Sequence, residues 1–67
     1  MAVARVTEIT ASSPLGFEDA IQRGIQRANK TLRNLKSAWV QEQTVKIENG
    51  EITEYRVNMK VTFVLDD

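Results

Sequence analysis

The side chains best suited to hold a ligand are Trp39 and the polar residues around it. Trp39 is the only tryptophan of the chain, and Gln41, Gln43 and Arg56 follow it in the C-terminal half. An indole offers a flat surface for stacking planar rings, and amide or guanidinium groups hydrogen-bond the edge of such a ring. This pattern indicates either a ligand platform or a subunit interface in which Trp39 packs against another chain or against Lys60.

Catalysis has few candidate side chains. The chain has no His and no Cys, which removes imidazole bases, thiol nucleophiles, disulfides and ordinary zinc sites. Its three glycines form neither a phosphate-binding loop nor a dinucleotide fingerprint. We therefore expect a binding protein without catalytic residues rather than an enzyme.

Two other charged groups are open to more than one interpretation. A short basic stripe consists of Arg23, Arg27 and Lys30. This stripe suits a phosphate, but it also suits a solvated helix face. Glu48 and Glu51 flank a turn, and two aspartates end the chain at 66–67. Such oxygen ligands are those that Ca²⁺ and Mg²⁺ prefer, although solvated acids follow the same pattern.

The length and charge of the chain limit its class. Sixty-seven residues predict one domain, 1–67, whose core is too small to give much stability by itself, so we expect partner subunits. Nine basic and nine acidic residues balance, which argues against nucleic-acid and membrane-surface binding. No stretch resembles a signal peptide or a membrane span, and we expect a cytoplasmic protein.

Four elements follow from the pattern of residues. The β-branched segment 3–11 predicts a first strand. Ser12, Ser13 and Pro14 predict the start of a helix, with a hydroxyl cap and a proline at the first helical position. An apolar stripe at steps of three and four residues then predicts about five helical turns. Its members are Phe17, Ala20, Ile21, Gly24, Ile25, Ala28, Leu32 and Leu35.

A hairpin completes the chain. Asn49-Gly50 is a strong signal for a type I′ turn, and residues 54–65 alternate between apolar and polar side chains. With a two-residue loop, opposite residues have numbers that sum to 99, so Trp39 faces Lys60, Gln43 faces Arg56 and Gln41 faces Asn58. A bulge between residues 40 and 45 would change this register.

These elements predict an α+β fold in the order β-α-β-β. The helical connection leaves room for the last strand between the other two, which gives a three-stranded antiparallel sheet of order 1-3-2. One amphipathic helix covers one face of the sheet. The other face, which carries Trp39, stays uncovered within a single chain.

The segments TEITASSPLGFEDAIQRGIQRANKTLRNL and EYRVNMKVTFVL, in their order and spacing, resemble the dodecin family over nearly the whole chain. This resemblance implies a hollow dodecamer of one subunit type. It also implies non-catalytic storage of flavin (riboflavin, FMN or a lumichrome-like ring), stacked between tryptophans of neighbouring subunits.

Two positions depart from the family pattern. Counting back from Tyr55 without gaps, the usual stacking tryptophan falls on Ser37, two residues before Trp39. The flavin-contacting glutamine of the family is replaced by Arg56, which donates hydrogen bonds but accepts none. By resemblance the flavin site comprises Trp39, Arg56, Gln41, Gln43 and Ser37. The alternative is a flavin-free oligomer that binds a divalent cation such as calcium, or a phosphorylated ligand, at its symmetry axes.

Overall fold

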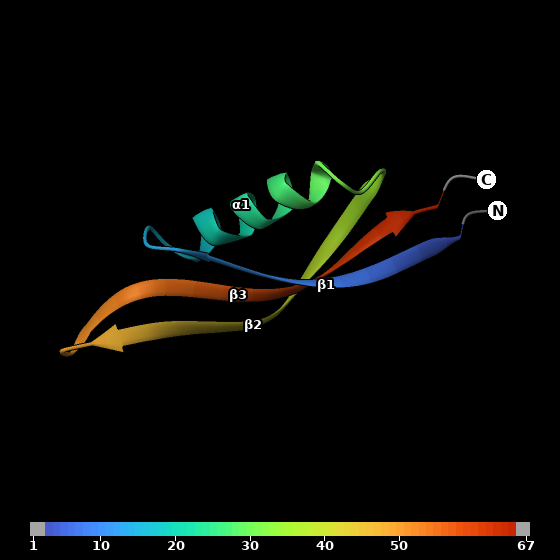
Figure 1. The fold of residues 1–67 in the computed structure, drawn as a ribbon. Coiled ribbons are helices and arrows are strands. Elements are labelled where there is room, and N and C mark those ends of the chain that lie inside the picture. The colour runs from blue at the N-terminus through green and yellow to red at the C-terminus, as the bar shows by residue number, and fades with distance from the viewer. Residues whose placement is uncertain (1–2, 66–67) are drawn as a thin grey trace.

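In the structure, a computed structural model that describes residues 3–65, one helix lies along one face of a three-stranded sheet (Figure 1). The elements are β1 (Ala4–Ser13), α1 (Phe17–Asn29), β2 (Leu35–Glu48) and β3 (Glu51–Val64). The strands are antiparallel in the order β1-β3-β2. The predicted fold class, element order and strand order are therefore confirmed.

The hairpin between β2 and β3 closes as predicted. Asn49 and Gly50 have φ angles of 53° and 77°, which are the positive values that a type I′ turn requires at both central positions. Glu48 and Glu51 lie opposite each other directly outside the turn. The hairpin extends well beyond the start of α1, so its tip is not covered by the helix (Figure 1).

The helix begins later than predicted. Ser12 and Ser13 belong to β1, opposite Arg56 and Tyr55, and α1 begins at Phe17 after an N-cap at Gly16 that makes no side-chain hydrogen bond. The buried hydroxyl of Ser13 donates a hydrogen bond to Asp19 and accepts one from the Leu15 backbone N–H. Pairing with β3 thus keeps both serines in the strand, and Ser13 ties the strand to the helix from there.

The helix also ends earlier than the apolar stripe suggested. It stops at Asn29, after which the Leu32 N–H still bonds the carbonyl of Ala28, whereas Leu35 begins β2. The C-cap Lys30 is still right-handed, whereas Asn34 has a φ of 61°, a left-handed conformation that turns the chain directly before β2. The apolar stripe therefore continues beyond the helix. Leu32 lies in the connection and Leu35 in β2, and both side chains are partly buried.

The core lies between α1 and the sheet. Among residues 3–65 the buried apolar side chains are Ala20, Ala28, Val57, Met59 and Val61. The three β3 members alternate, so the side chains of even-numbered β3 residues 54–62 lie on the opposite surface, which we call the outer face. Helix and sheet approach closely at Gly24, where an added Cβ would lie 2.7 Å from the Met59 Cε atom.

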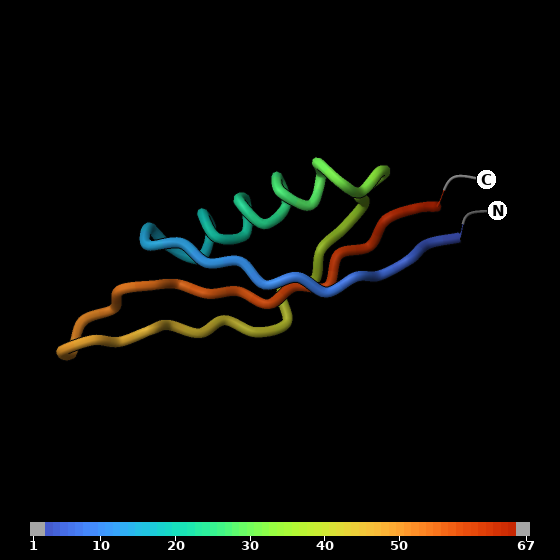
Figure 2. The backbone as a smooth tube through the Cα atoms, viewed as in Figure 1, coloured from blue at the N-terminus to red at the C-terminus, as the bar shows by residue number. Residues whose placement is uncertain are grey.

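A β-bulge bends β2 near its middle. Residues 38–40 of β2 pair with β3 by the predicted sum of 99, but from Glu42 to Lys46 the sum is 100. The shift between Val40 and Glu42 leaves Gln41 as an extra residue. Figure 2 shows the strand turning sharply between its first part, which approaches from the end of α1, and the long arm of the hairpin.

Candidate ligand-binding face of the sheet

The register arranges the outer face in rows that cross all three strands. In the order β1, β3, β2 they are Val6–Thr62–Ser37, Glu8–Lys60–Trp39, Thr10–Asn58–Glu42 and Ser12–Arg56–Thr44. No element within residues 3–65 packs on this side, since α1 covers the other face (Figure 1). The outer face is therefore a polar surface with one large aromatic side chain on its edge strand.

Trp39 occupies the predicted place on that surface. It lies opposite Lys60, whose Nζ is 5.7 Å from the centre of the indole ring. This is within the range of a cation–π contact. Even with Lys60 beside it, Trp39 keeps 62% of its surface exposed. Packing against its own strand neighbour therefore does not cover the ring, and a broad area of indole is left for a ligand or a second chain.

The predicted partners of Gln41 and Gln43 are wrong, because the register shifts twice. Between Ile47 and Lys46 the residue Thr53 of β3 has no opposite residue, and at Gln41 the extra residue on β2 restores the predicted register. Thr44, not Gln43, lies opposite Arg56, and Glu42, not Gln41, lies opposite Asn58. A shift of one residue moves side chains to the other face of a sheet. Gln43 therefore pairs with buried Val57 on the helix side, and Gln41 has no partner in the register.

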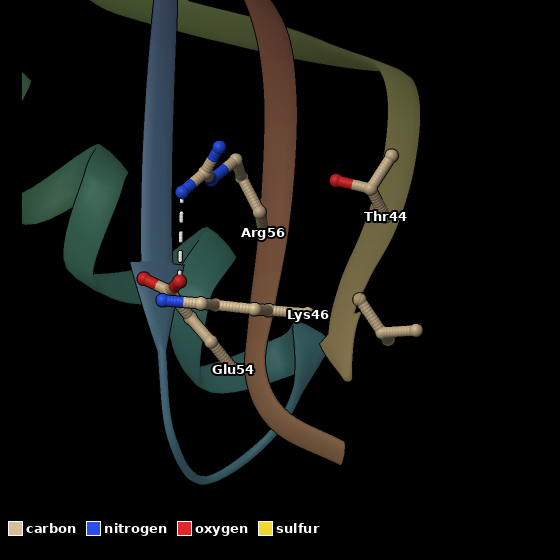
Figure 3. Close-up of a pocket in the computed structure, with 5 residues that line it drawn as sticks. Thr44, Lys46, Glu54 and Arg56 are labelled. Carbon is tan, nitrogen blue, oxygen red and sulfur yellow. Dashed lines mark hydrogen bonds and ion pairs between the residues drawn. The ribbon is translucent and has the colours of Figure 1, made fainter. Parts of the chain in front are cut away.

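Arg56 lies on the outer face but at a distance from the indole. It lies two rows from Lys60, which corresponds to about 13 Å along β3. Its Nη2 atom lies 3.5 Å from the Glu54 carboxylate, and both residues line a shallow hollow with Thr44, Val45 and Lys46. Figure 3 shows Arg56 and Lys46 converging on Glu54 from neighbouring strands. Within one chain, Arg56 and Trp39 thus belong to separate parts of the face.

Ser37 shares the outer face with Trp39, as the two-residue spacing predicted. It lies opposite Thr62 in the adjacent row, about 7 Å from the Trp39 row along the strand. Asn58, in the row on the other side of Trp39, is engaged by a hydrogen bond from its Nδ2 to the Thr10 hydroxyl at 3.1 Å. Within the described residues, the Trp39 row and the two adjacent rows therefore contain Lys60, small or amide side chains, and the exposed carboxylates of Glu8 and Glu42.

The charged groups considered for ion binding are spread out. Glu48 is 3.5 Å from the Lys46 ammonium, and in the helix the Arg23 Nε lies 2.6 Å from the Asp19 carboxylate, an i,i+4 ion pair. Within residues 3–65 no three acidic side chains gather closely enough to hold a metal ion. The aspartates at 66–67 lie outside the described residues. Nor does the described part of the chain contain a helix long and apolar enough to cross a membrane.

Comparison with known proteins identifies the family. Residues 3–66 match the sequence profile of the Dodecin family. The chain is 37% identical over 65 residues to the dodecin of Thermus thermophilus, covering 97% of this chain and 94% of that protein. It is 30% identical over 63 residues to the calcium dodecin of Mycobacterium tuberculosis, with coverage of 94% and 89%.

Solved structures agree with the sequence matches. The dodecin from Streptomyces davaonensis superposes with a TM-score of 0.94 at 42% identity, over 98% of this chain and 97% of that one. The Mycobacterium tuberculosis calcium dodecin, described as having a novel calcium-binding site, gives a TM-score of 0.82 at 31% identity, over 96% and 91%. On its sequence and on its fold alike, this chain belongs to the dodecin family.

Proposed function

We propose that this protein is a non-catalytic, cytoplasmic flavin-binding protein that stores or sequesters flavin, with Trp39 as the stacking surface. The observation that carries the proposal is an indole with 62% of its surface exposed on a sheet face that its own chain leaves bare. In a chain of the dodecin family, such a ring is suited to stacking an isoalloxazine, because planar aromatic systems gain contact area and favourable offset geometry.

We further propose that the site is completed by a second copy of the chain in a hollow dodecamer. The isolated subunit is elongated, 52 × 19 × 13 Å, with a radius of gyration of 13.8 Å, whereas a compact chain of this length would have about 11 Å. Large apolar side chains remain exposed along its length, including Leu15, Ile47 and Ile52 at 72%, 62% and 50%. A subunit with so small a core and so much apolar surface gains stability by association.

Self-association also explains how polar residues that lie far from the indole of their own chain can belong to the same site. Arg56 is about 13 Å along the sheet from the Trp39 row of its own chain, so in our proposal it contacts flavin held on a neighbouring subunit. Ser37 lines the pocket beside Trp39. Gln41 and Gln43 lie at the bulge on edge strand β2, where they are available to a partner rather than to Arg56 of the same chain.

The proposal is tested by titrating riboflavin with ligand-free protein while following flavin and tryptophan fluorescence. We expect saturable quenching of both, and release of chemically unaltered riboflavin on denaturation. Trp39→Ala should weaken binding roughly tenfold to hundredfold, since aromatic stacking contributes about 1–3 kcal/mol. The control is Gln22→Ala, which removes an exposed polar side chain from α1, on the other side of the sheet from Trp39. Riboflavin affinity unchanged in Trp39→Ala would refute this assignment.

A second candidate function is calcium binding, supported by the 30% identity to a relative named calcium dodecin. Because residues 3–65 of one chain gather no carboxylate cluster, such a site would combine acids from several subunits or use residues 66–67. Thermal melting in Ca²⁺ and in chelator distinguishes the two functions. A higher melting temperature in Ca²⁺ together with no flavin quenching would favour the cation. Identical melting curves would count against it.

A further inference from the structure

We propose that Lys60 is a specificity-determining residue of the Trp39 platform: its ammonium favours the form of a stacked ring that carries more negative charge. The inference rests on the proposed function, because it concerns flavin stacked on Trp39. It goes beyond that function because it assigns the relative affinity of the site for reduced and oxidised flavin to one side chain, Lys60.

The geometry places one positive charge beside the indole. Lys60 lies opposite Trp39 in the register, and its Nζ is 5.7 Å from the ring centre. Lys60 is half-buried on the central strand, between Met59 and Val61, whose side chains are buried under α1. The register thus fixes the backbone position of Lys60, and partial burial shields its side chain in part from water. A three-ring ligand that overlaps the indole extends past its rim and comes within reach of this ammonium.

The other charged groups of the outer face are placed less closely to the indole. Glu8 on β1 lies opposite Lys60 on the side away from Trp39, and Glu42 on β2 lies in the next row; both are exposed. Arg56 on β3 lies two rows away and is engaged with Glu54. Helix α1 contributes no charge to this side because it packs on the other face. Exposed carboxylates are screened by solvent and salt, so within one subunit Lys60 is the charge that acts most strongly on the ring. An Arg56 supplied by a neighbouring subunit is the same in the wild type and in Lys60 variants, so a comparison between them isolates the contribution of Lys60.

Two physical effects of the Lys60 ammonium both favour reduced over oxidised flavin. Two electrons and one proton convert the neutral oxidised isoalloxazine to a hydroquinone anion at pH 8, and a neighbouring cation stabilises the anion relative to the neutral ring. An ammonium near the indole also attracts the π electrons of the indole. This weakens the stacking of the indole with the electron-poor ring of oxidised flavin. Lys60 therefore raises the affinity for reduced flavin relative to oxidised flavin, compared with the same site lacking the charge.

The size of the effect follows from Coulomb's law. For a charge about 6 Å away and an effective dielectric constant between roughly 20 and 80, the ratio of the two affinities changes by about threefold to hundredfold. For a two-electron couple this corresponds to a midpoint potential about 15–60 mV more positive in the wild type than in a variant without the charge.

The test is an anaerobic redox titration of protein-bound riboflavin at pH 8 with dithionite. Lys60→Met keeps the long apolar stem and removes the charge, Lys60→Gln is a second neutral variant, and Lys60→Arg restores the charge. The control is Lys30→Met, which removes the same charge from an exposed position at the end of α1, on the other side of the sheet. We expect a more negative potential in both neutral variants, and the wild-type potential in Lys60→Arg and Lys30→Met.

The outcomes separate this inference from the proposed function. If wild type and the neutral Lys60 variants bind riboflavin with the same potential, the role of Lys60 is overturned while flavin binding stands. If the wild-type protein does not quench riboflavin at all, the proposed function fails and this inference fails with it. As a check that needs no variant, added salt should move the wild-type potential in the negative direction; a potential independent of salt would also overturn the role of Lys60.

Discussion

Replacing Gly24 by alanine tests the packing between helix and sheet. Gly24 lies in the middle of α1, where alanine is ordinarily the better helix former by about 0.5–1 kcal/mol. At this position, however, an added Cβ would lie 2.7 Å from the Met59 Cε atom and 3.0 Å from the Ala11 Cβ. Both distances are shorter than a carbon–carbon contact at its optimum of roughly 3.5–4.0 Å.

The two effects oppose each other, and packing should be the larger. The Met59 side chain is flexible in principle but completely buried, and Ala11 cannot withdraw without moving β1. Overpacking of this kind costs about 1–3 kcal/mol. After subtracting the gain in helix propensity, we expect Gly24→Ala to lower the free energy of unfolding by about 1 kcal/mol, or roughly 4–8 °C in melting temperature.

The assay is thermal and urea unfolding at one fixed subunit concentration, because association makes the stability of an oligomer concentration-dependent. Gln26→Ala, on the exposed side of the same helix, is the matched control and should stay within about 0.5 kcal/mol of wild type. In a Met59→Leu background, which has no atom at the Cε position, the cost of Gly24→Ala should shrink. A Gly24→Ala protein more stable than wild type by the helix-propensity difference would refute the packing argument.

Three further predictions follow from the fold. Ser13→Ala should cost about 1–2 kcal/mol of unfolding free energy, because it leaves the Leu15 N–H without its acceptor and removes a donor to Asp19; an unchanged urea midpoint would contradict this. Gly50→Ala should cost about 1 kcal/mol, since φ is 77° at that position, whereas equal stability would argue against the type I′ turn. Light scattering on the eluting protein should give a mass twelve times the 7.6 kDa subunit, and a monomer at micromolar concentration would contradict self-assembly.

The features that sequence predicted well depend on interactions close along the chain. Asn49-Gly50 specifies its turn because both residues tolerate positive φ. The regular alternation of β3 places Val57, Met59 and Val61 in the core. Residues in the turn itself, or within a regular alternation, thus have positions that local rules determine.

The features that sequence missed depend on partners distant along the chain. Ser12 and Ser13 carry a helix-start pattern, but pairing with β3 keeps them in β1. Gln41 is an extra residue between two regular stretches of β2, and no residue type near it specifies a bulge. Such a bulge is decided by how a strand wraps around the core. The predicted contacts of Gln41 and Gln43 were wrong because the register also shifts between Lys46 and Ile47, near the turn. The bulge at Gln41 compensates for that shift, so the Trp39–Lys60 pair was right.

The position of the tryptophan has a consequence that depends on the register alone. A stacking residue at position 37 would lie opposite Thr62, whereas Trp39 lies opposite Lys60. The step of two residues keeps the ring on the outer face and moves it about 7 Å along β2. A neutral hydroxyl beside the ring is thereby exchanged for a half-buried ammonium. In the proposed function, the shifted tryptophan therefore provides the same kind of stacking surface in a different electrostatic environment. The midpoint potential of bound flavin, compared between wild type and Lys60 variants, measures the effect of that environment.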